Sequence, residues 1–534
     1  MMKIQYYSLI APVVKRISQR SSEPLLRVRF LPGAPVNMKK IFSIPKEVSA
    51  VTETLENKGF EAYLVGGCVR DLLLEKKPRD WDITTNAKPE EIIASFEETF
   101  YENEYGTVGV VNKNTEDLTL KVIEVTPYRI EGGYSDKRRP DSVEFSQKIE
   151  DDLKRRDFTI NALALKLGRK IESKYEGTLV DNFSGQDDLK KGLIRAVGKP
   201  HERFNEDALR ALRAIRLVAE LGFVIEAETE KAIADNAVHL KEIAPERIRE
   251  EFIRIIESPS PADGLMLAKK LGVLQYIIPE IEEGVEIKQN KAHAFDVFEH
   301  IMRTLAHAAK KGFPLEVRLA ALLHDIGKPR TRAWSDEKKD WTFYGHDVVG
   351  SKITAKILSR MRFPTKTIDA VTRLVRWHMF FSDTEHITLS AVRRIVAKVG
   401  TERVWDLMNV RICDRIGTGR PKESPYRLRK YNSMVEEVLR DPISVGMLKI
   451  KGARIIEIAK IAPGPKIGQI LHAILEEVLE DPKRNNIEYL EKKAVELANL
   501  PESELKTLGE KGKEKKEKEE EKELKEIRKK YWVE

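Results

Sequence analysis

The spacing of apolar residues changes near residue 202, and this change limits the folds open to the chain. Upstream, short apolar runs predict a helix over Lys46–Glu56 and strands at Glu61–Val65, Asp80–Thr84, Thr107–Val111, Leu118–Thr126 and Val143–Phe145. Downstream, residues such as Leu209, Leu212 and Ile215 recur at three- and four-residue steps, which is typical of amphipathic helices. With 534 residues, we expect a multidomain chain in which an α+β N-terminal domain precedes all-α regions.

Composition excludes several classes of protein. The two cysteines, Cys68 and Cys413, rule out a disulfide scaffold or a Cys-rich zinc module, and they indicate a reduced, cytoplasmic protein. No run approaches the roughly 20 apolar residues that span a bilayer, so we expect no membrane association. The net charge is +8, but residues 1–37 alone hold six bases and one acid. Overall charge therefore does not identify a nucleic-acid binder.

The segment around Gly66-Gly67 predicts a ligand-binding turn between a strand and a helix. Glycines there let the backbone approach a ligand closely, and free N–H groups at a helix start bind phosphate. Asp80 and Asp82 follow in strand-like sequence, where residues i and i+2 share a face. Paired carboxylates select Mg²⁺ or Mn²⁺, which predicts phosphoryl or nucleotidyl transfer. The alternative is an exposed acidic pair on a solvated edge strand.

Two further polar features accompany this pair. Glu124, an acid within an apolar strand, would supply a third carboxylate. The cluster Arg155–Ala162 runs into what we expect to be an apolar helix. Within it, Asp157 either caps that helix or, with Arg156, contacts a ribose and its phosphates.

A run of charges downstream predicts base recognition. On one helix, Asp207, Arg210 and Arg213 at i, i+3 and i+6 would face a single ligand. A carboxylate accepts from the exocyclic amino groups that C and A carry, while guanidinium groups donate to ring nitrogens or O2. The alternative is an ordinary Asp207–Arg210 ion pair with Arg213 and Arg216 solvated.

Four blocks of the chain together carry a family resemblance: Gly66-Gly67-x-x-Arg70-Asp71, Asp80-x-Asp82, Arg155-Arg156-Asp157-Phe158-Thr159-Ile160-Asn161, and Glu206-Asp207-x-x-Arg210-x-x-Arg213-x-x-Arg216. In this order they resemble the class II tRNA nucleotidyltransferases, the CCA-adding enzymes, and their bacterial poly(A) polymerase relatives. The resemblance implies template-independent rebuilding of the 3′-terminal CCA of tRNA from CTP and ATP, with Mg²⁺ as the cofactor.

The same resemblance implies roles for individual residues. Asp80 and Asp82 would bind the metals, with Glu124 as the third catalytic acid. Gly66, Gly67 and Arg70 would contact the triphosphate. The remaining nucleotide-binding residues would be Arg156 and Asp157 at the ribose, Asn161 beside them, and Glu206, Asp207, Arg210, Arg213 and Arg216 at the base.

A second metal centre is indicated by His324-Asp325 at the end of an apolar helical stretch. With His300 upstream and Asp414 downstream, the set resembles the HD phosphohydrolase pattern of H, HD and D. Such ligands suit Ni²⁺, Mn²⁺ or Mg²⁺, and a bound water would hydrolyse phosphate esters. His346 and His378 would complete a second metal position. The resemblance implies phosphatase or 2′,3′-cyclic phosphodiesterase activity; the alternative is a purely structural helical body.

Composition and the resemblance together divide the chain into six regions. They are a basic arm, transit peptide or over-extended start at 1–37, a nucleotidyltransferase palm at 38–200, a helical neck that recognises the nucleobase at 201–285, an HD domain at 286–420, a helical tRNA-binding body at 421–501, and a tail at 502–534 that is rich in charges but has no net charge. Within the body, Ile443–Leu479 resembles the family's RNA-binding segment and would hold the acceptor stem and 3′ end of tRNA. The alternative there is a packed helical domain with a proline-glycine turn. The sequence does not set the oligomeric state.

Three activities remain open beside CCA addition: poly(A) synthesis, addition of A alone, and HD-type hydrolysis as the main activity. The glycine- and charge-rich loop Tyr128–Ser142 bears on this choice. In the resembling family a loop at this place accompanies the switch from C to A addition, and CC-adding members have it shortened. Its presence here favours full CCA addition.

Overall fold

The computed structural model describes residues 40–102, 105–133, 142–290, 294–380, 387–501 and 504–505. The expectations for the N-terminal arm and for almost all of the charged tail lie outside these residues, as do those for the tip of the loop Tyr128–Ser142. The described chain forms two compact units. The first holds the residues up to Glu286 with Ala309–Leu315 and Ile357–Phe363; the second holds Ile287–Ala308, Glu316–Lys356 and the chain from Pro364 onward. Among the described residues, no helix is both long and apolar enough to cross a bilayer.

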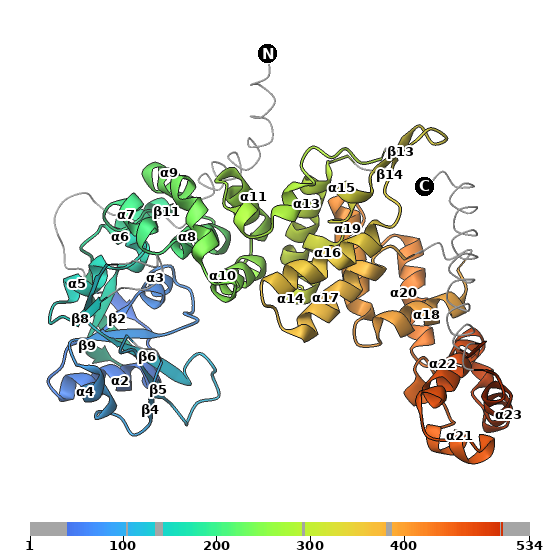
Figure 1. Ribbon diagram of the computed structural model, residues 1–534. Helices are drawn as coiled ribbons and strands as arrows, with labels where there is room; N and C mark the ends of the chain where they lie inside the picture. The colour runs from blue at the N-terminus through green and yellow to red at the C-terminus, as the bar shows by residue number, and fades with distance from the viewer. Residues whose placement is uncertain are drawn as a thin grey trace. The chain divides into compact units, whose positions relative to one another are not determined.

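An eight-stranded sheet organises the N-terminal part of the first unit (Figure 1). Its strand order is β1-β10-β9-β2-β3-β6-β5-β4. Only the β3–β6 pair is parallel; the other neighbours are antiparallel. The strands are β1 (Lys40–Phe42), β2 (Ala62–Val65), β3 (Asp82–Thr85), β4 (Thr99–Tyr101), β5 (Val108–Val111), β6 (Val122–Pro127), β9 (Ala164–Ile171) and β10 (Lys174–Val180).

Short helices and a hairpin accompany the sheet. Helices α2 and α4 pack on the sheet strands (Figure 1). The buried cluster of Val65, Tyr128, Ile149, Leu153 and Ala164 joins α5 to the central strands. These elements are α2 (Lys46–Asn57), α3 (Gly67–Leu73), α4 (Pro89–Ile93), α5 (Ile149–Lys154), α6 (Gly185–Lys191) and the β7 (Arg129–Gly132) to β8 (Ser142–Phe145) hairpin.

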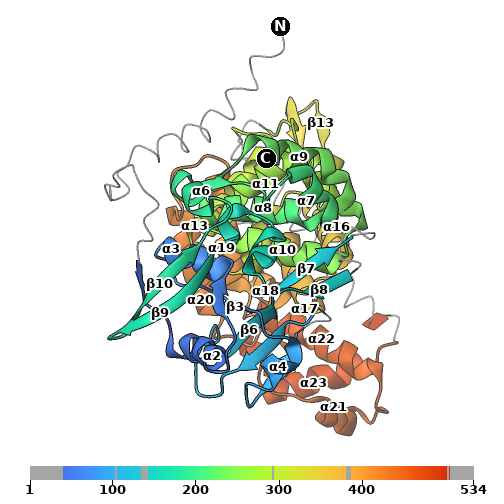
Figure 2. The same ribbon diagram turned by 90° about the vertical axis from the view of Figure 1, so that its left-hand side faces the viewer.

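The predicted strands and the helix over Lys46–Glu56 are confirmed within a few residues, but two expectations were wrong. Residues after the Arg155–Ala162 cluster form the long strand β9, not an apolar helix; β9 and β10 make the ribbon seen in Figure 2. Part of the glycine-rich loop forms strand β7, which pairs with β8. Strand β9 completes its hydrogen bonds with β10, the next strand in the chain, and with β2, which is distant in sequence. Strand β7 completes its hydrogen bonds with β8.

The rest of the first unit is helical. Prolines open α7, α10 and α11. Their fixed φ suits the first helical position, and no hydrogen bond within the helix is lost there, because an N–H at that position has no partner in the helix. The elements are β11 (Leu193–Ile194), α7 (Pro200–Glu206), α8 (Leu209–Leu221), β12 (Val224–Ile225), α9 (Ala227–Asn236), α10 (Pro245–Glu257), α11 (Pro261–Lys270) and α12 (Pro279–Glu282).

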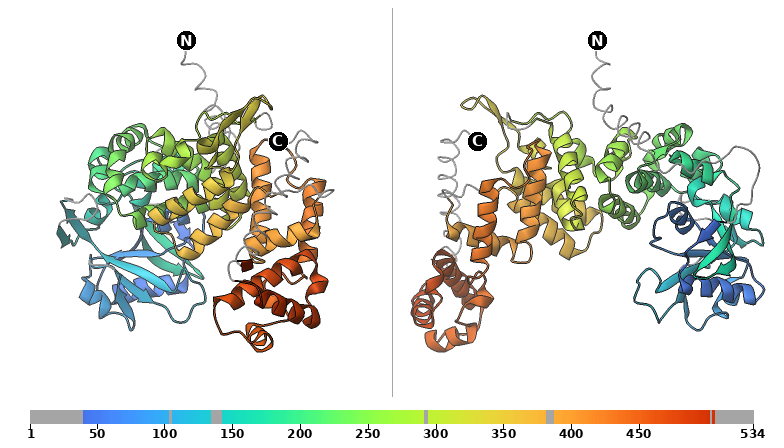
Figure 3. Two further views of the ribbon diagram at one scale, coloured as in Figure 1. Left: turned by 45° about the vertical axis from the view of Figure 1, so that its right-hand side comes forward. Right: turned by 180° about the vertical axis from the view of Figure 1, so that it is seen from behind.

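Helices also dominate the second unit. Its elements are α13 (Val297–Lys310), α14 (Leu315–Leu323), α15 (Lys328–Thr331), β13 (Ala333–Ser335), β14 (Asp340–Thr342), α16 (His346–Arg360), α17 (Thr365–Trp377), α18 (Leu389–Val399), α19 (Val404–Gly417), α20 (Tyr426–Val438), α21 (Gly452–Ala459), α22 (Pro465–Glu480) and α23 (Ile487–Ala498). The last residues of α13 and α16 and the first residue of α14 belong to the first unit. Between α19 and α20 the chain is not helical. Helices α21, α22 and α23, red in Figure 3, pack together as a small group.

Candidate functional site

Three carboxylates meet where two neighbouring strands of the sheet begin. Asp82 opens β3, and Glu124 of β6 is its register partner in the parallel pair. Asp80 stands two residues before Asp82, and all three line a cavity of about 320 Å³. Burial, with a contribution from the other carboxylates, raises the pKa of Asp82 to about 6 and that of Glu124 to about 7. Nearby positive charge therefore does not fully compensate the three carboxylates, and this condition favours the binding of a divalent cation.

The predicted glycine turn lies directly against this cluster. Gly66 has φ of +81°, and α3 begins at Gly67. A methyl group on Gly66 would lie 2.9 Å from Nη1 of Arg156 and 3.5 Å from Oδ2 of Asp82. Glycine is thus needed both for the backbone angle and for the space, because the turn brings the start of α3 beside Arg156 and the carboxylates.

A buried line of hydrogen bonds joins the glycine turn to helix α8. Nη1 of Arg70 donates to Oδ1 of Asn161 at 2.9 Å, and Nδ2 of Asn161 donates to Oδ1 of Asp157 at 3.2 Å. Oδ2 of Asp157 lies 2.9 Å from Nε of Arg213. Burial raises the pKa of Asp157, but Arg213 and Arg210 outweigh it and hold that pKa below its ordinary value. Asp157 is therefore an ionised link between two motifs and not the cap of an α-helix.

Arg156 is held from the opposite side by a buried acid. Nη2 of Arg156 lies 3.0 Å from Oδ2 of Asp152, whose other oxygen lies 2.6 Å from Arg155. Nη1 of Arg155 in turn lies 3.1 Å from Glu131 on β7. The β7–β8 hairpin, formed by the two ends of the segment Tyr128–Phe145, is thus connected by ion pairs to the arginine beside Asp82.

The expected single helix through Asp207, Arg210 and Arg213 was wrong. Helix α7 ends at Glu206, Asp207 has extended backbone angles, and α8 starts at Leu209. Oδ1 of Asp207 accepts a hydrogen bond from the backbone N–H of Leu209. Short acidic side chains compete with the helix for backbone donors in this way, so the charge pattern continues while the helix does not.

The charged residues of this block have partners that the sequence did not reveal. Nη1 of Arg210 lies 2.6 Å from Glu206, and Arg210 also donates to the backbone carbonyls of Arg203 and Arg155. Arg216 is buried against Glu251 at 3.2 Å, so it is not solvated. The expected alternative, an Asp207–Arg210 pair, is not the arrangement found.

Asp207 is paired instead with Arg247 of α10, a residue that the sequence analysis missed. Nη2 of Arg247 lies 2.8 Å from Oδ2 of Asp207. Forty residues separate the two, and nothing in the local pattern of Pro245–Glu257 links them. Only the packing of α10 against α8 brings them together.

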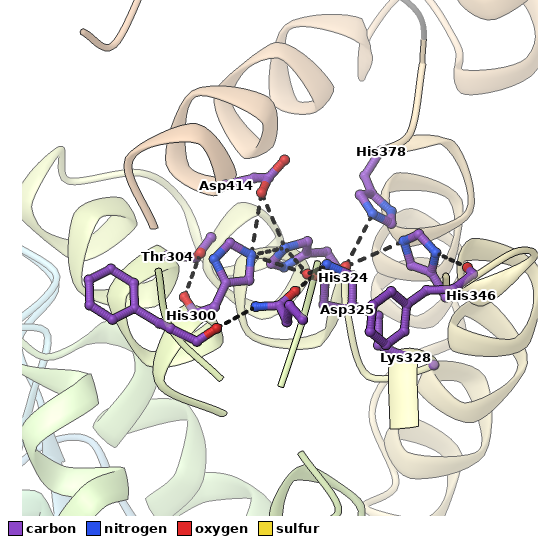
Figure 4. Close-up of polar contacts among 12 residues, drawn as sticks. His300, Thr304, His324, Asp325, Lys328, His346, His378 and Asp414 are labelled. Carbon is purple, nitrogen blue, oxygen red and sulfur yellow. Dashed lines mark hydrogen bonds and ion pairs between the residues drawn. The ribbon is translucent and has the colours of Figure 1, made fainter. Parts of the chain in front are cut away.

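Six side chains predicted to bind metal converge in the second unit (Figure 4). They form two triads, His300 with His324 and Asp414, and Asp325 with His346 and His378, and within each triad the potential ligand atoms lie within 4.8 Å of one another. Oδ2 of Asp325 lies 3.1 Å from Nε2 of His300, while its Oδ1 lies 3.4 Å from Nε2 of His346. Asp325 therefore bridges two adjacent positions.

Backbone carbonyls orient three of these imidazoles. Because a carbonyl only accepts, the Nδ1–H groups of His324, His346 and His378 donate to Ala321, Phe343 and Val375 at 3.0, 2.6 and 2.7 Å. Their Nε2 atoms consequently point inward, and those of His346 and His378 are buried without a hydrogen bond. In metal sites, a carbonyl that accepts from one ring nitrogen fixes the orientation of a histidine whose other nitrogen binds the metal.

The charge of the cluster also suits a cation. Burial lowers the pKa of His324, but the carboxylates of Asp325 and Asp414 outweigh it and raise that pKa to about 10. Arg411 holds the second oxygen of Asp414 at 2.7 Å. The potential that retains a proton on His324 equally attracts a divalent metal, so the donor set fits the predicted metal centre.

Lys328 is a further residue at this centre to which the sequence analysis gave no role. Its Nζ lies 2.6 Å from Oδ2 of Asp325 and donates to Gln289 at 2.6 Å. Its position three residues after Asp325 was the available signal. Gly327, the residue before Lys328, packs closely against His346, because a methyl group on Gly327 would lie 2.2 Å from the carbonyl oxygen of His346. Lys328 is therefore held near His346.

The C-terminal turn Pro463–Gly468 begins helix α22 at Pro465. Lys466, a basic residue of this turn, donates from Nζ to the backbone carbonyls of Ala498 at 2.7 Å and Leu500 at 3.0 Å. This lysine therefore ties α22 to the end of α23. The observed contact favours a structural role for the turn, while tRNA binding by this body stays a prediction.

Three family models match the chain in the order that the sites suggest. They are the poly A polymerase head domain over residues 62–195, the probable RNA and SrmB-binding site of polymerase A over residues 222–284, and the HD domain over residues 297–417. The first model contains the carboxylate cluster, and the third contains all six side chains of the histidine–aspartate centre.

Curated relatives cover most of the chain. The CCA-adding enzyme of Leuconostoc mesenteroides is 33% identical over 472 residues, which are 86% of this chain and 99% of the relative. The A-adding tRNA nucleotidyltransferase of Deinococcus radiodurans is 35% identical over 347 residues, 63% of this chain and 76% of the relative. The crystal structure of Bacillus stearothermophilus CCA-adding enzyme in complex with CTP is 28% identical, with a TM-score of 0.62 over 85% of this chain and 98% of that one. The chain therefore belongs to the class II tRNA nucleotidyltransferase family, that of the CCA-adding enzymes, and carries an HD domain.

Proposed function

We propose that this protein adds C, C and A to the 3′ end of tRNA, with CTP and ATP as substrates. The observation that carries the proposal is the cluster of Asp80, Asp82 and Glu124 in one cavity beside the Gly66 turn. Its support is the near-complete coverage of a relative named a CCA-adding enzyme and the likeness to a structure solved with CTP. The two cysteines are free thiols, which suits a cytoplasmic protein.

Asp80 and Asp82 would hold Mg²⁺, with Glu124 beside them. When bound, a pair of such ions neutralises the triphosphate and lowers the pKa of an attacking hydroxyl. The first backbone N–H groups of α3 and the guanidinium of Arg156 would bind phosphate oxygens next to these carboxylates. The 3′ hydroxyl of tRNA would then attack the α-phosphorus, with pyrophosphate leaving.

Base selection would depend on Asp207. Its carboxylate accepts from the amino group that cytosine and adenine both carry, whereas uracil and guanine present a carbonyl oxygen at the corresponding position. Arg210 would donate to the ring acceptors, which requires it to exchange some of its present partners, Glu206 and two backbone carbonyls. Arg213, ion-paired with Asp157, would connect the base to the ribose-sensing residues.

The catalytic proposal is tested by replacing the carboxylates one at a time. We expect Asp82→Asn and Asp80→Asn to lower the incorporation of labelled CTP and ATP by about 10³-fold or more, because each removes charge that binds the metals. Asp187→Asn is the matched control, since Asp187 of α6 is an exposed acid paired with exposed Lys190 and does not line the cavity. Retained incorporation by Asp82→Asn would contradict the proposal.

The base-selection proposal has a separate test. We expect Asp207→Ala to incorporate UTP and GTP alongside CTP and ATP while its requirement for Mg²⁺ stays unchanged. Unaltered discrimination against UTP in this variant would remove Asp207 from the base-reading role.

Addition of A alone and poly(A) synthesis are the alternatives within the same chemistry. The A-adding enzyme of Deinococcus radiodurans is as similar in identity as the CCA-adding relative, although over a shorter stretch. The retained loop Tyr128–Ser142, with its base paired as the β7–β8 hairpin, favours full CCA addition.

The histidine–aspartate centre favours a second function, hydrolysis of phosphate esters. His300, His324 and Asp414 would hold one divalent metal, and His346 and His378 a second, with Asp325 bridging both. When bound, the metals supply an activated water and polarise the phosphoryl group. Water then displaces an alcohol and leaves phosphate, or opens a 2′,3′-cyclic phosphate to a monoester.

Hydrolysis is tested on the full-length protein with Mg²⁺, Mn²⁺ or Ni²⁺. We expect His324→Ala and Asp325→Ala to lose the release of phosphate that the unaltered protein shows with one of these metals. His472→Ala is the control, because His472 lies on α22 outside the centre. Equal activity in all variants would end the proposal of a second active site.

A further inference from the structure

A small aromatic hairpin lies in the chain between the two halves of the histidine–aspartate centre. Strands β13 and β14 follow Asp325 and precede His346, and they pair Trp334 directly with Trp341. The two indole rings meet edge to face, with centroids 5.2 Å apart. Trp334 is nevertheless 52% exposed, so it is not buried in a core.

Cationic side chains flank the exposed rings. The guanidinium carbon of Arg332 lies 3.6 Å from the ring centroid of Trp341. Lys338 lies 2.5 Å from the hydroxyl of Tyr344, which is 54% exposed. A cross-strand tryptophan pair would by itself stabilise a hairpin. That role does not account for the exposure of Trp334 together with a guanidinium stacked on Trp341 and a second exposed aromatic residue.

The hairpin is connected to the metal centre by direct contacts. Phe343 directly follows β14, two residues after Trp341. The ring of Phe343 lies 5.6 Å from Nζ of Lys328, which in turn lies 2.6 Å from Asp325. The carbonyl of Phe343 also orients His346 (Figure 4). The end of the hairpin is therefore connected to the bridging carboxylate of Asp325 through the contacts of Phe343 and Lys328.

We propose that this hairpin is a nucleobase platform that gives the histidine–aspartate centre its substrate class, the phosphorylated 3′ end of an RNA or a nucleoside monophosphate. A base stacks on Trp334 beside Trp341 and Arg332, and the phosphate ester is directed to the side where Lys328 and Asp325 lie. Every base has an aromatic face, so such a platform accepts different terminal nucleotides. The proposal rests on the hydrolytic function proposed above and specifies what that site selects.

Two secondary phosphomonoesters that differ in the base provide the test. Hydrolysis of 3′-AMP and of glycerol 2-phosphate is measured on the full-length protein with Mn²⁺ or Ni²⁺. Trp334→Ala is expected to raise KM for 3′-AMP about tenfold, as loss of one stacked base predicts, without changing kcat. Hydrolysis of glycerol 2-phosphate stays unchanged, and Trp334→Tyr retains the low KM.

A matched control separates the platform from exposed tryptophans in general. Trp405 of α19 is 37% exposed and lies outside the hairpin, so Trp405→Ala is expected to behave as the unaltered protein with both substrates. The inference is overturned if Trp334→Ala changes both substrates equally or changes neither.

Binding separates failure of the platform from failure of the hydrolase. If the unaltered protein hydrolyses neither compound, the hydrolytic function fails, and the platform is decided by fluorescence anisotropy of an RNA pentamer that ends in a 3′ phosphate. Weaker binding by Trp334→Ala, by about tenfold, with no loss in Trp405→Ala, supports the platform. Equal affinity in both variants overturns it. Comparison of 3′-AMP with the pentamer as competitors shows whether a free nucleotide or an RNA end is preferred.

Discussion

At the scale of single residues, Asp207 is notable because both of its carboxylate oxygens already have partners. One accepts from the backbone N–H of Leu209, and the other lies 2.8 Å from Arg247. A carboxylate fixed at two points presents its remaining lone pairs in one direction. Arg247 would therefore act as a positioning residue for base selection, through the orientation of Asp207.

We predict that Arg247→Ala lowers the preference for CTP and ATP over UTP about tenfold, because one charge-assisted contact that orients Asp207 is lost. Competitive incorporation assays on one tRNA measure this preference. Arg254→Ala is the control, since Arg254 lies on the same helix and is 3.6 Å from Glu220. If both variants lose preference equally, the Asp207–Arg247 pair has no special role.

The carboxylate cluster predicts a pH dependence of the response to Mg²⁺. The pKa values of Asp82 and Glu124, about 6 and about 7, lie above their ordinary values of 3.8 and 4.5. Protonation is therefore favoured by folding, and the stability it gives is lost as pH rises through 6 and 7. Mg²⁺ binds the ionised form and offsets that loss.

We therefore expect Mg²⁺ to raise the Tm more at pH 8 than at pH 5, measured by calorimetry against EDTA. Asp82→Asn removes one of the two titrating groups and reduces this difference, while metal bound at the histidine–aspartate centre contributes equally to both proteins. An identical pH dependence in Asp82→Asn would show that the cluster does not bind the cation.

At the scale of elements, the turn between β2 and α3 sets the distance between the carboxylates and the helix start that we propose binds phosphate. We predict that Gly66→Ala costs about 1–2 kcal/mol of stability for its backbone angle, and also lowers nucleotide incorporation by displacing Arg156. Gly59→Ala separates the two effects, because Gly59 has φ of +90° with nothing within 4 Å.

Thermal unfolding and incorporation are measured for both glycine variants. Comparable losses of stability with loss of activity only in Gly66→Ala are the expected result. A fully active Gly66→Ala protein would argue against the close approach of Arg156 to the turn.

The same elements show what sequence can predict. The β2–turn–α3 unit and the strand of Asp82 were found because glycines and the i, i+2 acids are local signals. Strand β9 was missed because an apolar run such as Ala162–Leu165 suits a buried strand or a helix equally, and only pairing with β2 and β10 decides between them.

The two candidate sites differed in how far sequence could reach. For the histidine–aspartate centre, the six residues that the structure brings together as potential metal ligands had all been named from the sequence, because histidines are few and the order H, HD, D is informative. For base recognition, the helix break at Asp207 and its pairing with Arg247 depend on contacts between helices that have no local pattern.

At the scale of the whole molecule, the two sites lie in different compact units. The carboxylate cluster belongs to the first unit, and the histidine–aspartate centre belongs to the second. We predict that Asp82→Asn abolishes nucleotide addition while phosphate-ester hydrolysis continues, and that His324→Ala has the reverse effect. Both activities are measured on the same preparations; loss of both in either variant would contradict two independent sites.

The central claim is that this chain builds the complete CCA end, and one measurement tests it most directly. Three tRNA transcripts, ending before the first C, before the second C and before A, are incubated with CTP, ATP and Mg²⁺, and the products are sequenced. Our account predicts that all three are completed to CCA and that addition stops there. Extension only of the transcript that already ends in CC, or growth of a long A tail, would contradict it.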